Sequence, residues 1–208
     1  MKKISDYFNN IYCINLKSRK DRWQQAQDEF KKFGIIDSIK RYNATDGSKV
    51  TNPNPRLLKG EVGILMTHIN LIEMAKKRNY ENILIMEDDV YFTDELNNLE
   101  EYMNSVPENW DLLYFGANHV YGKLPLEIIN DKIVKLNYSV GLQCVAIKNT
   151  MFDKILDLIP NFEKQVDAYY GSLMNNCNAY AFYRNIALQR EGFSDIQGRN
   201  VNYDEFFK

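Results

Sequence analysis

Three adjacent carboxylates, Glu87, Asp88 and Asp89, follow directly after an apolar run at residues 83–86 (ILIM). Carboxylates this close repel one another, which raises their pKa values unless a cation or hydrogen bonds neutralise them. Clustered hard oxygen ligands suit Mg²⁺ or Mn²⁺, and such an ion also offsets the charge of a diphosphate leaving group. The alternative is a solvated acidic turn. The triplet therefore indicates either a divalent-cation site or an exposed turn.

The apolar run before the triplet has no alternation of polar and apolar residues. Runs of this kind are typical of a strand buried on both faces of a parallel sheet. Ligands of open α/β sheets bind beyond the carboxyl ends of the strands. We therefore expect the triplet to lie at a ligand-binding edge of a sheet.

A second strand is predicted at residues 11–16 (IYCINL), and a helix follows it at once. Ser18 and Asp21 fit the Ser-x-x-acid capping pattern, apolar residues then recur at helical spacing, and Gly34 suits the helix end. Strand, tight turn and helix together are the opening of a βαβ unit.

The rest of the chain continues the alternation of strands and helices. Residues 41–47 read as a loop with turn chemistry at Asp46-Gly47, and an amphipathic helix begins near Gly60 and ends around residues 76–78. Strands are predicted at 111–115, 134–138 and 142–147, and helices at 150–159 and 165–175. The pattern predicts an α/β fold with helices packed on a mostly parallel sheet, in which the later strands could run antiparallel. We expect residues 1–208 to form a single domain.

Composition excludes several classes of protein. The net charge of −2 and the pI of about 5.8 leave no basic surface for nucleic acid. Cys13, Cys144 and Cys177 are far apart, odd in number and without metal-ligand spacing, which favours a reducing compartment. Cys13 and Cys144 lie inside apolar strand-like runs and are expected to be small buried hydrophobes. No signal peptide is evident, and no segment approaches the ~20 apolar residues of a membrane span. We expect a soluble cytoplasmic protein, with peripheral association with a membrane that bears the acceptor left open.

Several blocks of the chain, in their order and spacing, resemble glycosyltransferase family 25 between about residues 11 and 198. The blocks are Ile14-Asn15-Leu16, Arg19 with Asp21-Arg22, Ala44-Thr45-Asp46-Gly47, Glu61-Val62-Gly63-Ile64, Thr67-His68, residues 83–90, Val166-Asp167 and Gly192-Phe193-Ser194-Asp195-Ile196. The family includes lipooligosaccharide galactosyltransferases and collagen hydroxylysine galactosyltransferases. The resemblance implies a GT-A fold, an α/β domain built on a nucleotide-binding half.

The resemblance also implies that the acidic triplet is the acid-x-acid metal motif of such enzymes. Asp89 would be the first-choice ligand of Mn²⁺ or Mg²⁺, with Glu87 as its partner or as a contact of the donor ribose, and Asp88 would belong to the same donor site. Many glycosyltransferases have Asp at the first position, so the role of Glu87 stays open.

The donor nucleotide is then implied to lie over the end of the first strand. Asn15, Leu16 and Arg19 would approach the base or phosphates, and Ala44 and Asp46 the base and ribose. A strand-to-helix turn does offer backbone N–H groups and a favourable dipole to anions. Arg19 and Arg22 could equally be surface residues of the first helical turn, and Asp46 a plain turn residue.

The family is described as inverting, so a base must take the proton of the acceptor hydroxyl. Asp167 is the preferred base, and Asp195 is the rival base or an outer contact of the metal. Asp167 also opens a predicted helix, where acids are favoured by the dipole alone. His68 lies on the apolar stripe of its helix with no second ligand four residues on, so a structural role and a donor-site role both remain open.

The predicted function is metal-dependent, inverting transfer of a hexose, galactose or glucose, from a UDP-sugar to a hydroxyl of a glycan, a lipid-linked glycan or a hydroxylated protein. A phosphohydrolase or nucleotidyltransferase also places acids at strand ends, but residues 15–17 (NLK) supply no nucleophilic Asp for the former. No Gly-x-x-x-x-Gly-Lys-Ser/Thr run supports a P-loop kinase. A catalytically silent domain that binds glycan or protein is the other alternative, and the costly triplet argues against it.

Overall fold

The central sheet of the computed structural model has eight strands among the residues that the structure describes, 2–118 and 127–202. Their order across the sheet is β2-β1-β3-β8-β5-β9-β7-β6. The bounds are β1 Ile11–Asn15, β2 Ile39–Asn43, β3 Asn82–Glu87, β5 Leu112–Tyr114, β6 Glu127–Ile128, β7 Ile133–Lys135, β8 Cys144–Lys148 and β9 Ala179–Phe182.

The strands β2, β1 and β3 run parallel, with Ile14 opposite both Tyr42 and Glu87. Their carboxyl ends therefore meet at one edge of the sheet. Farther along the sheet β8 and β7 run antiparallel to each strand they pair with, whereas β5 and β9 are parallel to each other. The prediction of an α/β fold, with later strands able to run antiparallel, is confirmed.

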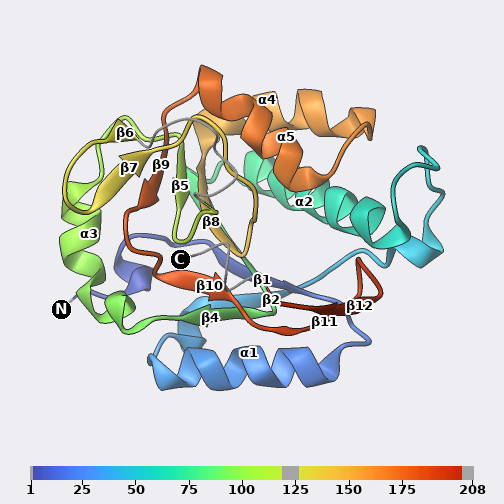
Figure 1. The fold of residues 1–208 in the computed structure, drawn as a ribbon, viewed down its shortest axis with the longest axis horizontal. Helices are drawn as coiled ribbons and strands as arrows, with labels where there is room; N and C mark the ends of the chain where they lie inside the picture. The colour runs from blue at the N-terminus through green and yellow to red at the C-terminus, as the bar shows by residue number, and fades with distance from the viewer. Residues whose placement is uncertain (1, 119–126, 203–208) are drawn as a thin grey trace.

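Helices cover both faces of this sheet (Figure 1). One apolar cluster joins α2 (Lys59–Lys77), α4 (Phe152–Leu158) and α5 (Val166–Leu173) to one face of the strands. A second cluster joins α1 (Lys20–Lys32) and α3 (Leu99–Ser105) to the other face. In β3, Ile83 and Ile85 belong to the first cluster and Leu84 and Met86 to the second. The alternation explains why this strand is apolar throughout.

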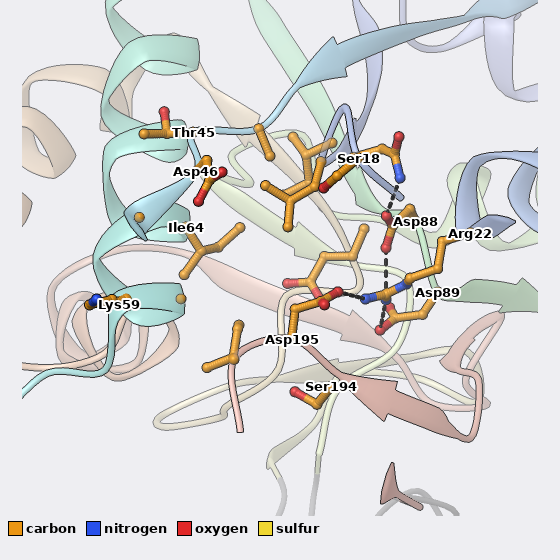
Figure 2. Close-up of a pocket in the computed structure, with 18 of the residues that line it drawn as sticks. Ser18, Arg22, Thr45, Asp46, Lys59, Ile64, Asp88, Asp89, Ser194 and Asp195 are labelled. Atoms are coloured by element: carbon orange, nitrogen blue, oxygen red, sulfur yellow. Dashed lines mark hydrogen bonds and ion pairs between the residues drawn. The ribbon is translucent and has the colours of Figure 1, made fainter. Parts of the chain in front are cut away.

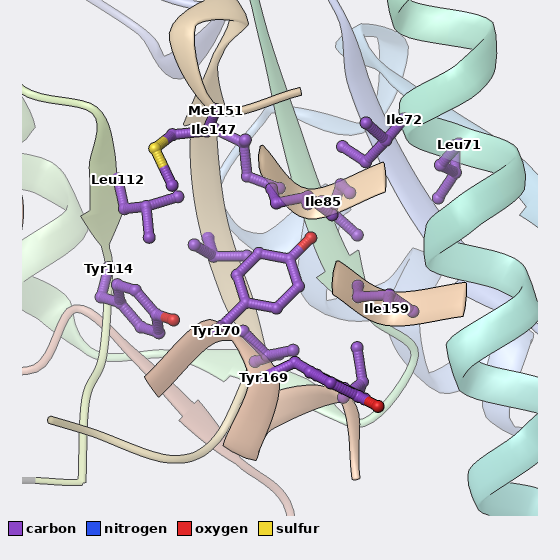
Figure 3. Close-up of a cluster of buried hydrophobic side chains, with 14 of the residues drawn as sticks. Leu71, Ile72, Ile85, Leu112, Tyr114, Ile147, Met151, Ile159, Tyr169 and Tyr170 are labelled. Carbon is purple, nitrogen blue, oxygen red and sulfur yellow. The ribbon is translucent and has the colours of Figure 1, made fainter. Parts of the chain in front are cut away.

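The ring of Tyr170, from α5, fills the centre of the first cluster together with Tyr169 (Figure 3). Both tyrosines are almost fully buried, and they lie near Ile85 and Ile147 of the central strands. The packing fixes α5, and with it the Val166-Asp167 block, against the sheet and α2.

Two small antiparallel sheets extend the fold beside the carboxyl end of β3. One pairs β4 (Val90–Phe92) with β10 (Ala187–Gln189). The other is a hairpin of β11 (Gly192–Ser194) and β12 (Arg199–Val201). Short β segments of this kind carry no long apolar run, which is why the sequence pattern does not reveal them.

Several details of the predicted elements are wrong. The strand expected at 134–138 is β7, Ile133–Lys135, and the central strand β9 was not predicted. The first helix begins at Lys20 with Arg19 as its N-cap and no side-chain cap, so Ser18 is not the capping residue. The predicted loop at 41–47 begins inside β2, an edge strand whose polar sequence hides it. The helix expected at 150–159 is shorter, because 3-10 turns at Asn149–Met151 and Ile159–Asn161 flank α4.

The cysteines behave as expected from their spacing, since all three are free and Cys13 and Cys144 are buried. Within residues 2–118 and 127–202, no helix has the length and apolar content needed to cross a membrane.

Candidate active site

A cavity of about 350 Å³ lies beyond the carboxyl ends of β1, β2 and β3. Its walls are the end of β1, the loop after β2, the first turns of α2, the acidic triplet and residues 194–196 of the hairpin. The volume is within the range of ligand-binding pockets. The edge predicted from the strand pattern is therefore where the structure has its cavity.

The acidic triplet forms the turn between β3 and β4. Asp88 is engaged by other residues through both carboxylate oxygens, because Oδ2 accepts from the Asn15 amide and Oδ1 lies 2.7 Å from Arg22 Nη2. Burial raises the pKa of Asp88 to about 6. Asp88 is thus held in place as part of the wall.

Asp89 is the member of the triplet whose carboxylate is not fully hydrogen-bonded within the described residues. Its Oδ2 accepts from Gln189 at 3.1 Å and from Arg22, whereas Oδ1 is buried and has no hydrogen-bond partner among the described residues. The return strand β10 also fixes the turn, because Arg190 N donates to the Asp89 carbonyl at 2.7 Å. A buried carboxylate oxygen without a hydrogen-bond partner is suited to a cation.

Glu87 ends β3 and lines the same cavity. Burial, followed by the negative charge of Asp89, raises the pKa of Glu87 to about 8. In the described part of the chain no cluster of three or more His, Cys, Asp or Glu side chains forms a metal cage. Glu87 and Asp89 instead fit a cation that takes one or two protein carboxylates and completes its shell with phosphates and water, as Mg²⁺ does.

Asn15 connects this turn to the rest of the site. Its side-chain Nδ2 donates to Asp88 and, at 3.1 Å, to the Arg19 carbonyl, and its Oδ1 accepts from Arg41. Because these groups are satisfied inside the protein, the side chain of Asn15 orients Asp88. Asn15 was predicted to approach the nucleotide. The structure supports this only in that Asn15 lines the cavity.

Arg22 contacts the acidic triplet and is not a plain surface residue of the first helical turn. Its guanidinium lies between three carboxylates, with Nη2 bonded to Asp88 and Asp89 and Nη1 3.6 Å from Asp195 (Figure 2). The side chain is 14% exposed. Arg22 therefore occupies the side of the triplet that faces α1, and it lines the cavity.

The loop after β2 forms the opposite wall, and its residues Ala44 and Asp46 line the cavity. Ala44 N donates to the Asn15 carbonyl at 3.0 Å, and the Asp46 carboxylate caps the next turn by accepting from Ser48 N at 3.0 Å. A Cβ on Gly47 would be 1.6 Å from the Lys59 carbonyl oxygen. The close approach requires glycine and locks the loop against the start of α2.

The β11–β12 hairpin closes the cavity from the side of the carboxyl-terminal segment. Asp195 pairs with Arg19, and a Cβ on Gly60 would be 2.7 Å from the Cα atom of Ile196. The hairpin is thus held by an ion pair at α1 and by close packing at α2. Asp195 lines the cavity, but its contacts are arginine side chains.

Asp167 lies in the first turn of α5, outside the cavity lining. Its Oδ1 accepts from Ala168 N at 2.8 Å, a Gly141 backbone N–H also donates to it, and burial raises its pKa. Its charge acts on Glu87 as well. Asp167 therefore influences Glu87 from α5 without lining the cavity.

Two predicted donor-site residues lie elsewhere. His68 is fully buried between α2 and α5, with Nδ1 3.1 Å from the Tyr170 hydroxyl, and it does not line the cavity. Its structural role on the apolar stripe is the one the structure supports. Arg19 lines a smaller neighbouring cavity instead and binds Asp21 and Asp195, because the side chain lies one helical turn before Arg22.

The family model described as glycosyltransferase family 25 (LPS biosynthesis protein) matches residues 8–166. A glycosyltransferase 25 family member of Aedes aegypti is 25% identical over 199 residues, covering 81% of this chain and 31% of its own length. Procollagen galactosyltransferase 2 of Mus musculus is 27% identical over 177 residues, covering 74% of this chain and 28% of its own length. The chain thus spans about a third or less of these relatives.

Solved structures with a similar course of the chain include A197 from STIV, with 13% identity and a TM-score of 0.46 over 89% of this chain and 95% of that one. The galactosyltransferase LgtC in complex with donor and acceptor sugar analogs gives 10% identity and a TM-score of 0.42 over 82% of this chain and 72% of that one. Both TM-scores are below 0.5, so these similarities carry no argument about function.

Proposed function

This chain belongs to glycosyltransferase family 25, and we propose that it transfers a hexose, galactose or glucose, from a UDP-sugar to an acceptor hydroxyl with inversion at the anomeric carbon. The fold would be of the GT-A type, and the whole of residues 1–208 would act as one domain. The acceptor would be a glycan, a lipid-linked glycan or a hydroxylated protein. Relatives named procollagen galactosyltransferases and the family description as an LPS biosynthesis protein support this range of acceptors.

The charge balance of the cavity is the observation that carries the proposal. The lining contains five carboxylate residues and two cationic residues, Arg22 and Lys59. A diphosphate would be repelled by this excess of negative charge. A divalent cation held by Asp89 and Glu87 would reverse that balance and offset the charge on the leaving diphosphate. Mn²⁺ and Mg²⁺ both suit such ligands.

The two halves of the cavity fit the two halves of a nucleotide-sugar. Ile14, Leu16 and Ile64 give an apolar wall beside the loop of Ala44 and Asp46, which suits a base and ribose. The triplet and Arg22 lie at the other side of the cavity, where the phosphates would be placed. The donor therefore lies across the ends of β1 and β3 in our proposal.

Asp167 is the proposed general base. An inverting displacement needs a base on the face of the sugar opposite the diphosphate. Asp167 belongs to α5 on one face of the sheet, whereas Arg22 belongs to α1 on the other face. A carboxylate whose pKa is raised by burial takes a proton more readily near neutral pH. Asp167 would accept the proton of the acceptor hydroxyl while the oxygen of that hydroxyl bonds to the anomeric carbon and the bond to the diphosphate breaks. Asp195 is less suited, because its carboxylate contacts Arg19 and Arg22.

The proposal is tested with a panel of UDP-sugars in the presence of Mn²⁺, scored for slow donor hydrolysis and for transfer to simple acceptors. We expect turnover of UDP-galactose or UDP-glucose and none of the nucleotide alone. A protein that binds UDP-sugars without any turnover would be a silent binding domain instead. Release of free phosphate from unrelated phosphate esters would favour a phosphohydrolase.

A further inference from the structure

Arg22 contacts the same carboxylate that the proposed cation would use. A cation expected beside Asp89 would approach a carboxylate that already has a positively charged partner, since Arg22 Nη2 contacts both Asp88 and Asp89. The guanidinium and the metal ion would therefore share Asp89. Either the arginine takes the place of the metal, or the arginine moves away from Asp89 when the metal binds.

We propose that Arg22 holds the triplet in the absence of metal and passes Asp89 to the divalent cation, and that its guanidinium then binds the diphosphate of the donor. The inference rests on the proposed function, because it assigns a phosphate-binding residue to that same site. Its ligand is the diphosphate of a nucleotide-sugar or the free nucleoside diphosphate.

The hydrogen bonding of the triplet supports this exchange. Asp88 uses Oδ2 for Asn15 and Oδ1 for Arg22, so it can keep Arg22 near the site without Asp89. Asp89 has the buried Oδ1 without a partner in the described chain, and its Oδ2 keeps the Gln189 contact at 3.1 Å when Arg22 leaves. The loss of one Arg22 contact therefore leaves no carboxylate of the turn without a partner once a cation is present.

The geometry of Arg22 also suits a phosphate. A guanidinium has five N–H donors, and it binds phosphate through two of them at once. In Arg22 a single nitrogen, Nη2, serves both Asp88 and Asp89, while Nη1 is 3.6 Å from Asp195, beyond direct hydrogen-bond length. The side chain retains donors, lines the cavity and starts from the first turn of α1, where the helix dipole also favours an anion.

Arg22→Gln separates this inference from a structural role. Calorimetry of Mn²⁺ alone should show tighter binding to the variant than to the wild type, by about tenfold, because the competing cation is gone. Calorimetry with Mn²⁺ present should show UDP binding weakened about tenfold, with UMP affected far less. The difference in affinity between UDP and UMP would therefore be smaller in Arg22→Gln than in the wild type.

Arg184→Gln is the matched control. It removes the same charge from an exposed position outside the cavity lining, where Arg184 pairs with Glu95 at 3.2 Å. Its Mn²⁺ and UDP affinities should equal those of the wild type. Arg22→Lys keeps a positive charge but lacks the fork of the guanidinium. Its affinity for Mn²⁺ alone should therefore be as low as that of the wild type, whereas its UDP affinity should lie between those of Arg22→Gln and the wild type. Arg22→Met, which also removes the charge, replaces Arg22→Gln if the latter does not fold.

The outcomes distinguish the two proposals. A wild-type protein that binds neither UDP nor Mn²⁺ overturns the proposed function. A wild type that binds both, with an Arg22→Gln variant whose Mn²⁺ affinity is unchanged or lower, overturns the exchange alone. Equal weakening of UDP and UMP in that variant overturns the assignment of Arg22 to the diphosphate.

Discussion

Asp88 and Arg22 form an ion pair in which Oδ1 and Nη2 are 2.7 Å apart, and the side chain of Arg22 is 14% exposed. Because Asn15 takes the other oxygen of Asp88, this acid is the internal member of the triplet. Asp89, with one buried oxygen that has no partner in the described chain, is the member left for a ligand. Asp88 therefore holds the turn together, whereas Asp89 is available to bind a ligand.

Asp89→Asn should abolish the Mn²⁺ dependence of UDP binding and remove turnover. The change keeps the shape of the side chain and deletes a charge that a divalent cation needs. Asp88→Asn is the comparison, since it also deletes one charge but from the carboxylate that Asn15 and Arg22 hold. We expect Asp88→Asn to keep Mn²⁺-dependent binding with reduced affinity, as measured by calorimetry. Full activity of Asp89→Asn with Mn²⁺ would show that the metal binds elsewhere.

Glu87→Gln should inactivate the enzyme and stabilise the fold. The pKa of Glu87 is raised to about 8, so ionising it in the folded state costs free energy that the unfolded state does not incur. That cost is absent below pH ~4.3, grows as the pH rises towards 8 and is constant above it. Urea denaturation should show the variant more stable than the wild type by roughly 1–3 kcal/mol at pH 8 and nearly equal to it at pH 4.5. A variant that is less stable at pH 8 would contradict this account of the buried charge.

Asp167→Asn should lower turnover by about 10²–10⁴-fold with donor affinity almost unchanged, because the general base acts on the acceptor. Asp195→Asn should instead loosen the hairpin by removing the contacts to Arg19 and Arg22 and should raise the donor KM. Steady-state kinetics of both variants separate the two roles. Proton NMR of the product gives the anomeric configuration, and retention would discard the single-displacement mechanism together with its base.

The buried His68 should make stability depend on pH. Burial lowers its pKa to about 4, below the unfolded value of about 6.5, so the folded state favours the neutral ring. Its contribution is complete above pH ~6.5 and is lost as the pH falls from there towards 4, by roughly 3 kcal/mol in all. The free energy of unfolding of the wild type should fall more steeply over this range than that of His68→Gln. Parallel pH profiles of the two proteins would refute the assignment.

The sequence pattern predicts the parts of the site that belong to long regular elements. The apolar run before Glu87 needs no knowledge of the rest of the chain, because a strand covered on both faces is apolar at every position. For His68, its place on the apolar stripe of α2 indicated a structural role, but the family resemblance kept a donor-site role open beside it. Local periodicity is therefore enough for the strand and not for the histidine.

Contacts between distant segments are beyond such reasoning. Arg19 and Asp195 are 176 residues apart in the chain, and their pairing depends on where the short hairpin folds back. Arg19 and Arg22 start the same helix, and the difference between them comes from the packing of α1 on the sheet. The assignment of the cavity-facing arginine to Arg22 therefore required the structure.

The most direct test of the account is the affinity of the wild-type protein for UDP, measured by calorimetry with Mn²⁺ and again with a chelator that removes all divalent cations. The cavity lining has five carboxylate residues against two cationic ones, so we expect binding with Mn²⁺ and at least about tenfold weaker binding in the chelator. Equal affinity under the two conditions would contradict a metal role for Glu87 and Asp89.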